Sequence, residues 1–98
     1  MEFLKPVENG FTVYSKSGCK NCIKIKHFLS SQNISFTIVE CDDYIIEKKE
    51  DFIFFINNLT NNKYRQFPVI FNNGIFIGEY SETINYCNKL MIDFNENF

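Results

Sequence analysis

Two cysteines separated by two residues are the part of this chain whose side chains are best suited to chemistry. Cys19 and Cys22 follow a short apolar run of β-type composition and open a stretch with helical periodicity. In that context the pair is typical of a redox motif, because thiols in a first helical turn can close a small disulfide. Unsatisfied N–H groups at a helix start, together with Lys16 and Lys20, favour a thiolate at Cys19. We therefore expect Cys19 to be the activated thiol.

Zinc sites and small secreted disulfide frameworks also contain pairs of this kind. A zinc site needs a second cysteine or histidine pair at matching spacing. Cys41 and Cys87 stand alone, and His27 lies inside the expected helix, most simply as a surface residue. The first residues show no apolar segment of signal-peptide length. The redox interpretation is therefore favoured, and Cys41 and Cys87 are expected to pack as small buried hydrophobes.

The composition predicts one soluble domain over residues 1–98. The chain is 45% hydrophobic and includes twelve phenylalanines, enough for a core without disulfide cross-links. Its net charge is -2, and lysine and arginine form no stripe that would bind a phosphate backbone. No apolar run approaches the ~20 residues that span a bilayer. We expect a cytoplasmic monomer that binds neither nucleic acid nor a membrane.

Strand-like and helix-like periods alternate along the chain. Strands are expected at 11–14, 34–39, 67–71 and 75–77, with a hairpin turn at Asn73-Gly74. Helices are expected at 20–32, at 47–61 after an Asp42-Asp43 loop, and from a Ser81 cap through Ile84, Cys87, Met91 and Phe94. A parallel βαβ unit, a hairpin and a closing helix predict an α/β fold of order βαβαββα. Its four-stranded mixed sheet would carry helices on both faces.

Three local motifs resemble the glutaredoxin branch of the thioredoxin-like superfamily. They run over 14–22, 65–71 and 77–82, and the similarity extends over nearly the whole chain after residue 9. The resemblance implies a thioredoxin-like fold and a glutathione-dependent thiol–disulfide oxidoreductase acting on mixed or protein disulfides. Glutathione would be a co-substrate, with no tightly bound cofactor and no metal. The implied partners are glutathione and disulfide-bearing or glutathionylated proteins.

The resemblance also implies residue roles. Cys19 would be the nucleophile and Cys22 the resolving thiol, and Pro68 would follow a cis peptide bond. The backbone of Phe67 would pair with the cysteinyl part of glutathione, and Lys16 would approach the glycine carboxylate. Ser81 and Glu82 would receive the γ-glutamyl carboxylate through their backbone N–H groups. The complete set expected to bind glutathione is Lys16, Lys20, Asn21, Phe67, Pro68, Ser81 and Glu82.

Elementary chemistry agrees with these roles, because glutathione carries two carboxylates around a thiol and needs cations, helix-terminal donors and an unpaired strand edge. Departures from the family pattern predict weaker binding. Lys20-Asn21 replaces Pro-Tyr, which removes an aromatic wall. Glu79 replaces the second glycine of a Gly-Gly turn and is expected to repel the γ-glutamyl carboxylate. The connection between Leu59 and Pro68 is also about two residues longer than usual in the family.

A second function class stays open. In an iron–sulfur binding or delivery module, two chains would share a cluster through Cys19 and two glutathiones. The missing proline after Cys19 favours this alternative. The Gly-Phe-Ser signature of monothiol cluster carriers is absent, however, and Cys22 offers an internal disulfide that competes with ligation.

Overall fold

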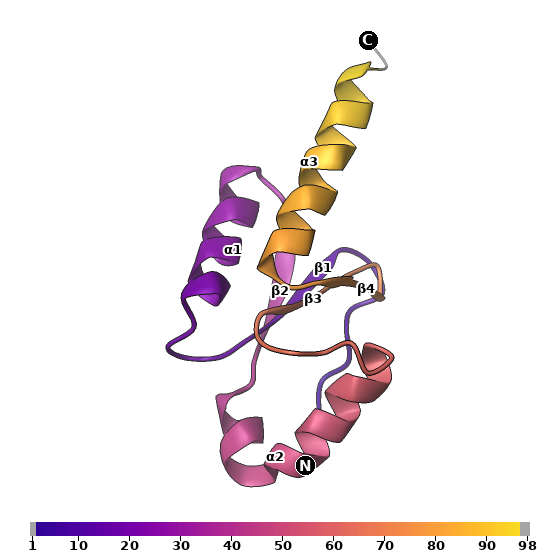
Figure 1. Cartoon of the computed structure of the whole chain (residues 1–98). Helices are drawn as coiled ribbons and strands as arrows, with labels where there is room; N and C mark the ends of the chain where they lie inside the picture. The colour runs from indigo at the N-terminus through magenta and orange to yellow at the C-terminus, as the bar shows by residue number, and fades with distance from the viewer. Residues whose placement is uncertain (1, 97–98) are drawn as a thin grey trace.

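Figure 1 shows the computed structural model, which describes residues 2–96. The elements follow the predicted order βαβαββα. They are β1 (Phe11–Ser15), α1 (Lys20–Ser31), β2 (Phe36–Glu40), α2 (Asp42–Leu59), β3 (Val69–Asn72), β4 (Ile75–Gly78) and α3 (Tyr80–Glu96). Side chains are described up to residue 90, so the expected apolar positions Met91 and Phe94 lie outside the described side chains.

The sheet has the strand order β2-β1-β3-β4 and is mixed, as predicted. β1 pairs in parallel with β2 and antiparallel with β3, and β3 pairs antiparallel with β4. All five residues of β1 are buried because this strand is central, which explains why Phe11, Val13 and Tyr14 are apolar although they point to different faces. Positive φ angles at Asn73 and Gly74 make the predicted tight turn between β3 and β4. The central strand β1 ends at Ser15, and the loop that follows it leads to Cys19.

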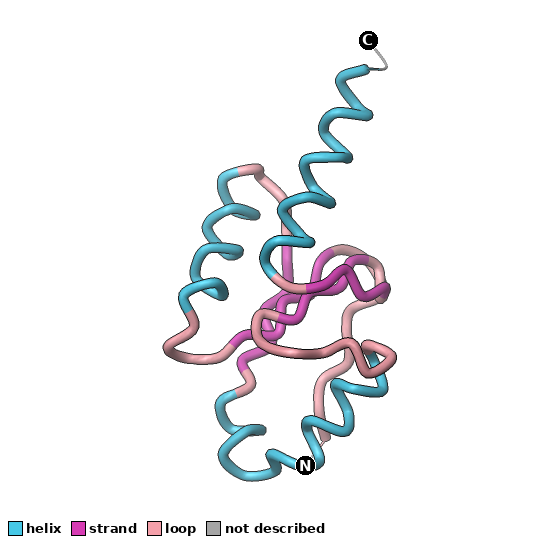
Figure 2. The backbone as a smooth tube through the Cα atoms, viewed as in Figure 1, coloured by secondary structure: helices cyan, strands magenta, loops and turns pink. Residues whose placement is uncertain are grey.

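Helices cover both faces of the sheet, as the sequence predicts. Figure 2 shows α1 and α3 beside one another on one face and α2 on the other. Successive residues of a strand point to opposite faces, and Val13 and Tyr14 accordingly belong to two different cores. Val13 packs in the cluster that includes Ile25 of α1, and Tyr14 in the cluster that includes Phe52 of α2.

The edge strand β2 is less buried than expected. The sequence predicts a half or wholly buried strand over 34–39, but only Val39 is buried in β2, while Thr37, Ile38 and Glu40 are exposed. An edge strand has a neighbour on one side only, so alternation of apolar residues overstates its burial. The described residues contain no helix that is both long and apolar enough to cross a membrane.

Asp42 and Asp43 do not form the expected loop, because they are the first two residues of α2. Carboxylates are stabilising in a first helical turn, where backbone N–H groups are unsatisfied. The backbone at Lys48 leaves the helical region (φ -143°, ψ 51°), so α2 is kinked there. The regular apolar spacing lies beyond the kink, which is why the periodicity indicated a helix starting only at Glu47.

The start of α3 also differs from the expectation. The helix begins at Tyr80, so Ser81 lies inside the first turn and is not the cap. Glu79 takes that position, since its carbonyl accepts from the Thr83 N–H at 3.1 Å. The Glu79 N–H in turn donates to a Glu82 carboxylate oxygen at 2.8 Å. This is the reciprocal half of a capping box, and its sequence signature is a Glu three residues into the helix.

Candidate active site

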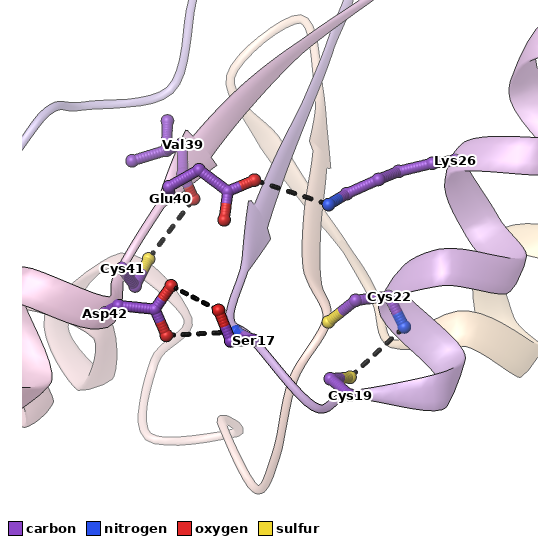
Figure 3. Close-up of polar contacts among 8 residues, drawn as sticks. All are labelled: Ser17, Cys19, Cys22, Lys26, Val39, Glu40, Cys41 and Asp42. Atoms are coloured by element: carbon purple, nitrogen blue, oxygen red, sulfur yellow. Dashed lines mark hydrogen bonds and ion pairs between the residues drawn. The ribbon is translucent and has the colours of Figure 1, made fainter.

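Cys19 is the N-cap of α1. Its backbone is extended (φ -99°, ψ 108°), and its Sγ accepts a hydrogen bond from the Cys22 N–H at 3.1 Å, drawn in Figure 3. The sulfur thus occupies the place that an N-cap oxygen usually takes. A hydrogen-bond donor and the positive end of the helix dipole both stabilise a negative sulfur there. Cys19 is partly exposed, so this sulfur is open to a reacting partner.

Cys22 is the opposite kind of thiol. It is only 1% exposed and packs in the core between the sheet and α2. Burial, followed by its hydrogen bond with Cys19, raises the pKa of Cys22 from 9.0 to about 11, although the Lys16 N–H and the Ser15 hydroxyl act in the opposite direction. At neutral pH Cys22 is therefore a neutral thiol placed behind an accessible sulfur.

The loop that presents Cys19 is fixed by its neighbour α2. Asp42 accepts from the Ser17 N–H at 3.0 Å and from the Ser17 hydroxyl at 2.9 Å (Figure 3). These two bonds hold the pKa of the Asp42 carboxyl below its usual value. Gly18 has φ +74°, a conformation that glycine adopts without strain. The loop therefore turns sharply into α1 while Ser17 stays tied to α2.

The two other cysteines are buried, as the sequence predicts. Cys41 is 0% exposed at the start of α2, and its thiol donates to the Val39 carbonyl at 3.3 Å. Cys87 packs on α3 in the opposite core. Burial raises the pKa of both thiols, to about 12 for Cys41. His27 lies exposed on α1, also as expected.

A groove with a volume of about 460 Å³ opens beside Cys19 and gathers much of the predicted site. Its lining holds four cationic side chains and no carboxylate among the described residues. The Lys16 Nζ lies 5.7 Å from the centroid of the Phe67 ring, which forms part of the groove wall. The lining residues are Lys16, Cys19, Lys20, Asn21, Lys24, Tyr64, Arg65, Gln66 and Phe67.

The part of the groove wall that Phe67 forms ends at a cis peptide bond between Phe67 and Pro68, as expected. Both residues are buried, and the Phe67 ring stacks on Phe52 with 6.2 Å between centroids. β3 begins only at Val69, and none of the loop hydrogen bonds between backbone groups of described residues involves Phe67. The backbone of Phe67 is therefore free to pair with an extended ligand.

Glu79 does not carry the isolated charge that the sequence suggests. Its carboxylate accepts from Arg65 Nε at 3.3 Å and from Gln66 Nε2 at 3.0 Å, and the side chain is only 14% exposed. These contacts join the segment before Phe67 to the start of α3. The charge of Glu79 is thus opposed by a cation that itself lines the groove beside Cys19.

The two residues expected at the γ-glutamyl end lie apart from that groove. Glu82 lines a second groove of about 460 Å³, whereas Ser81 is exposed and lines neither. Arg65 belongs to both grooves and so connects them. The residues that line the second groove are Asn62, Lys63, Arg65, Phe76, Ile77, Gly78, Glu79 and Glu82.

Some groove residues had no role assigned from the sequence. Lys24 lies four residues after Lys20, a spacing that places both on one side of α1. Arg65 and Gln66 directly precede Phe67 and Pro68, which were predicted to bind glutathione. Their position in the sequence could therefore have identified them as site residues. Among the described side chains, which end at residue 90, no group of three or more His, Cys, Asp or Glu is arranged to hold a metal ion.

Comparison with known proteins places this arrangement in one family. The glutaredoxin family model matches residues 11–77. Mitochondrial glutaredoxin-2 of Rattus norvegicus is 33% identical over 75 residues, which are 76% of this chain and 45% of that protein. The chain thus spans about half the length of the curated relatives it matches.

Solved structures show the same fold. The solution structure of a dithiolic glutaredoxin from Trypanosoma brucei brucei superposes with a TM-score of 0.69 at 25% identity, covering 87% of this chain and 84% of that one. A buckwheat glutaredoxin–glutathione complex gives a TM-score of 0.64 at 20% identity, covering 83% and 70%. The fold is therefore thioredoxin-like. With the family model matched across the redox motif and the groove, this chain belongs to the glutaredoxin family.

Proposed function

We propose that this protein is a glutathione-dependent thiol–disulfide oxidoreductase in which Cys19 is the nucleophile and Cys22 the resolving thiol. One observation carries the assignment. The Cys19 sulfur accepts the Cys22 N–H at the start of α1 and opens to a cationic groove, while the Cys22 sulfur is buried. Membership of the glutaredoxin family supports the same chemistry.

The reaction follows from this asymmetry. The Cys19 thiolate attacks one sulfur of a mixed disulfide, so that a bond to Cys19 Sγ forms, the substrate S–S bond breaks and the released thiolate takes up a proton. A glutathionyl group on Cys19 is then removed by a second glutathione, which yields oxidised glutathione. With a protein disulfide, Cys22 instead attacks Cys19 Sγ and releases the substrate's second thiol, leaving a Cys19–Cys22 disulfide.

Glutathione fits the groove beside Cys19 by charge and by hydrogen bonding. Its carboxylates would face Lys16 and Lys20, and its cysteinyl backbone would pair with Phe67, next to Pro68, as an added strand does. Asn21 would border the peptide where the family usually has an aromatic ring. The buckwheat relative is described as a complex with glutathione, which supports this ligand.

The γ-glutamyl carboxylate would lie at the start of α3, near the N–H groups of Ser81 and Glu82. Arg65 lines both grooves and, through its contact with Glu79, supplies a cation near this position. Glutathionylated and disulfide-bearing proteins would be the macromolecular substrates.

Steady-state turnover of a glutathionylated peptide with glutathione tests the proposal. We expect saturable deglutathionylation that is lost when the reduced protein is first alkylated with iodoacetamide at pH 6, with the label on Cys19. The Cys22, Cys41 and Cys87 thiols should stay unlabelled because they are buried. Turnover that survives complete alkylation of Cys19 would refute the assignment.

The Glu79→Gln variant should raise the KM for glutathione about twofold to threefold. Removing the carboxylate releases Arg65 and loosens the segment that carries Phe67, and an ion pair whose cation is largely exposed contributes less than about 1 kcal/mol. The effect should shrink at high salt because exposed charges are screened. The expected rise in KM is opposite to the fall that would follow if Glu79 repelled the γ-glutamyl carboxylate, as the sequence suggests.

Glu8→Gln is the matched control for Glu79→Gln, since Glu8 is an exposed carboxylate outside both grooves. It should leave the KM unchanged. A lower KM for glutathione in Glu79→Gln at low salt would show that the Glu79 carboxylate repels glutathione.

A further inference from the structure

The groove beside Cys19 is far more positive than the chain as a whole. The protein has a net charge of -2, yet four of its ten lysine and arginine residues line this groove, and no described carboxylate does. One of the four, Arg65, is opposed by Glu79, which lies 3.3 Å away. The other three are exposed, and no described carboxylate forms an ion pair with them. These three uncompensated cations are Lys16, Lys20 and Lys24.

Glutathione does not neutralise this charge. At neutral pH it carries two carboxylates and one ammonium group, so its net charge is about -1. The groove therefore keeps an excess of positive charge when glutathione is bound. That excess acts on whatever is joined to the glutathione sulfur, because the field of several like charges extends beyond the side chains that carry them.

Two of the uncompensated lysines lie on α1. Lys20 and Lys24 are one turn apart on the same side of this helix, which begins directly after Cys19. Lys24 is about 7.5 Å from Cys19 along the helix axis, at a rise of 1.5 Å per residue. The Lys24 Nζ lies 6.0 Å from the centroid of the Tyr80 ring, at the start of α3. The positive surface therefore extends from the reactive thiol along α1 to the start of α3.

Carboxylates of a protein substrate would lie within range of these two lysines. An extended chain advances about 3.3 Å per residue, so an Asp or Glu up to about three residues from the reacting cysteine is within roughly 10 Å of it. That distance is about the Debye length at 0.1 M salt, so the attraction is only partly screened. Acidic residues near the cysteine should therefore speed the encounter with the groove, and basic residues should slow it.

We propose that Lys20 and Lys24 make this protein selective for substrate proteins that carry Asp or Glu close to the reacting cysteine. The inference rests on the proposed function, because it concerns the protein half of the same mixed disulfide. The exchange itself is unchanged. Cys19 Sγ bonds to the glutathione sulfur, the bond from that sulfur to the substrate breaks, and the departing substrate thiolate takes up a proton. The lysines act before this step, on the approach of the substrate.

Three glutathionylated peptides test the selectivity. They differ only in the residues two positions before and after the cysteine, which are both Asp, both Asn or both Lys. The glutathionyl group is the same in all three, so its recognition cancels when their kcat/KM values are compared. We expect the wild type to prefer the Asp peptide to the Lys peptide about tenfold at low salt. This preference should fall towards unity in about 0.5 M sodium chloride.

Lys24→Gln should lower the preference about threefold, because one exposed charge is lost. Lys24→Arg keeps the charge and should keep the preference, and Lys20→Gln/Lys24→Gln should bring it close to unity. Lys26→Gln is the matched control. It changes the net charge equally on the same helix, but Lys26 lies outside the groove and pairs with Glu40 at 3.3 Å. It should leave the preference unchanged.

A preference that survives in Lys20→Gln/Lys24→Gln would overturn the inference. So would a higher KM for glutathione in Lys24→Gln with an unchanged preference among the peptides, since Lys24 would then serve glutathione. Loss of the preference in Lys26→Gln as well would also contradict it, because any change of net charge would then suffice.

A second readout is independent of turnover. The same peptides with serine in place of cysteine are titrated into Cys19→Ser at low salt, and binding is followed by amide chemical shifts. The Asp peptide should bind about tenfold more tightly than the Lys peptide, with shifts at Lys20 and Lys24, and Lys24→Gln should reduce this ratio about threefold. Equal binding of the two peptides would overturn the inference. If no glutathionylated peptide is turned over, the proposed function fails, and this titration still decides the role of the two lysines.

Discussion

The Cys19→Ser variant should lose both deglutathionylation and protein-disulfide reduction, whereas Cys22→Ser should lose only the second. A serine hydroxyl at the α1 N-cap stays protonated at neutral pH, so rates should fall to the uncatalysed background. Without Cys22, a second glutathione can still free Cys19. Turnover of a glutathionylated peptide and reduction of the insulin disulfides measure the two activities.

Cys87→Ser is the matched control for these cysteine variants. Cys87 is a buried thiol in the opposite core and should matter for neither activity. Equal loss of both activities in Cys22→Ser would contradict the monothiol route and make the internal disulfide obligatory.

Gly78→Ala should destabilise the fold by about 3 kcal/mol and weaken glutathione binding. Gly78 has φ +142°, and a Cβ placed there would lie 2.6 Å from the Glu82 Cβ. The Glu82 side chain would have to leave the Glu79 N–H, so the start of α3 would lose its cap. For a domain of this size, that loss corresponds to a fall in Tm of roughly 12–24 °C.

Gly10→Ala separates backbone strain from this contact. Gly10 also has positive φ (+94°), but a Cβ there meets nothing within 4 Å, so we expect a cost of about 1 kcal/mol from strain alone. Thermal unfolding of both variants measures the difference. Equal losses of stability would show that the Glu82 contact contributes nothing.

Local patterns were sufficient to predict the fold. Phe11, Val13 and Tyr14 are apolar because β1 is buried on both faces, and Asn73-Gly74 accepts the positive φ angles of a tight turn. Such features depend on neighbouring residues only, so they are visible in the chain before it folds. The element order and the mixed sheet followed from them.

The start of α2 could not be predicted because a tertiary contact takes part in it, whereas the start of α3 was missed because its capping residue is a glutamate. Asp42 begins a helix while binding Ser17, which is 25 residues away. The kink at Lys48 then hides the first turns of α2 from any test of periodicity. At α3, Ser81 has the better intrinsic capping propensity, yet the cap is Glu79, two residues earlier, and its N–H donates to the Glu82 carboxylate.

Part of the site could likewise be predicted from the sequence, and part of it depends on tertiary contacts. Lys16, Lys20, Asn21 and Phe67 line one groove with Cys19, because the redox motif and the cis-proline segment are adjacent in the fold. The pairing of Glu79 with Arg65 joins residues 14 apart through side chains, and the sequence does not encode that orientation locally.

The most direct test of the account is to map where glutathione attaches to the reduced protein. The protein is mixed with oxidised glutathione at pH 7, quenched within the first turnover, digested without reductant and analysed by mass spectrometry. The account predicts glutathione on Cys19 alone at early times, replaced later by a Cys19–Cys22 disulfide. Glutathione appearing first on Cys22, or no modification at Cys19, would contradict it.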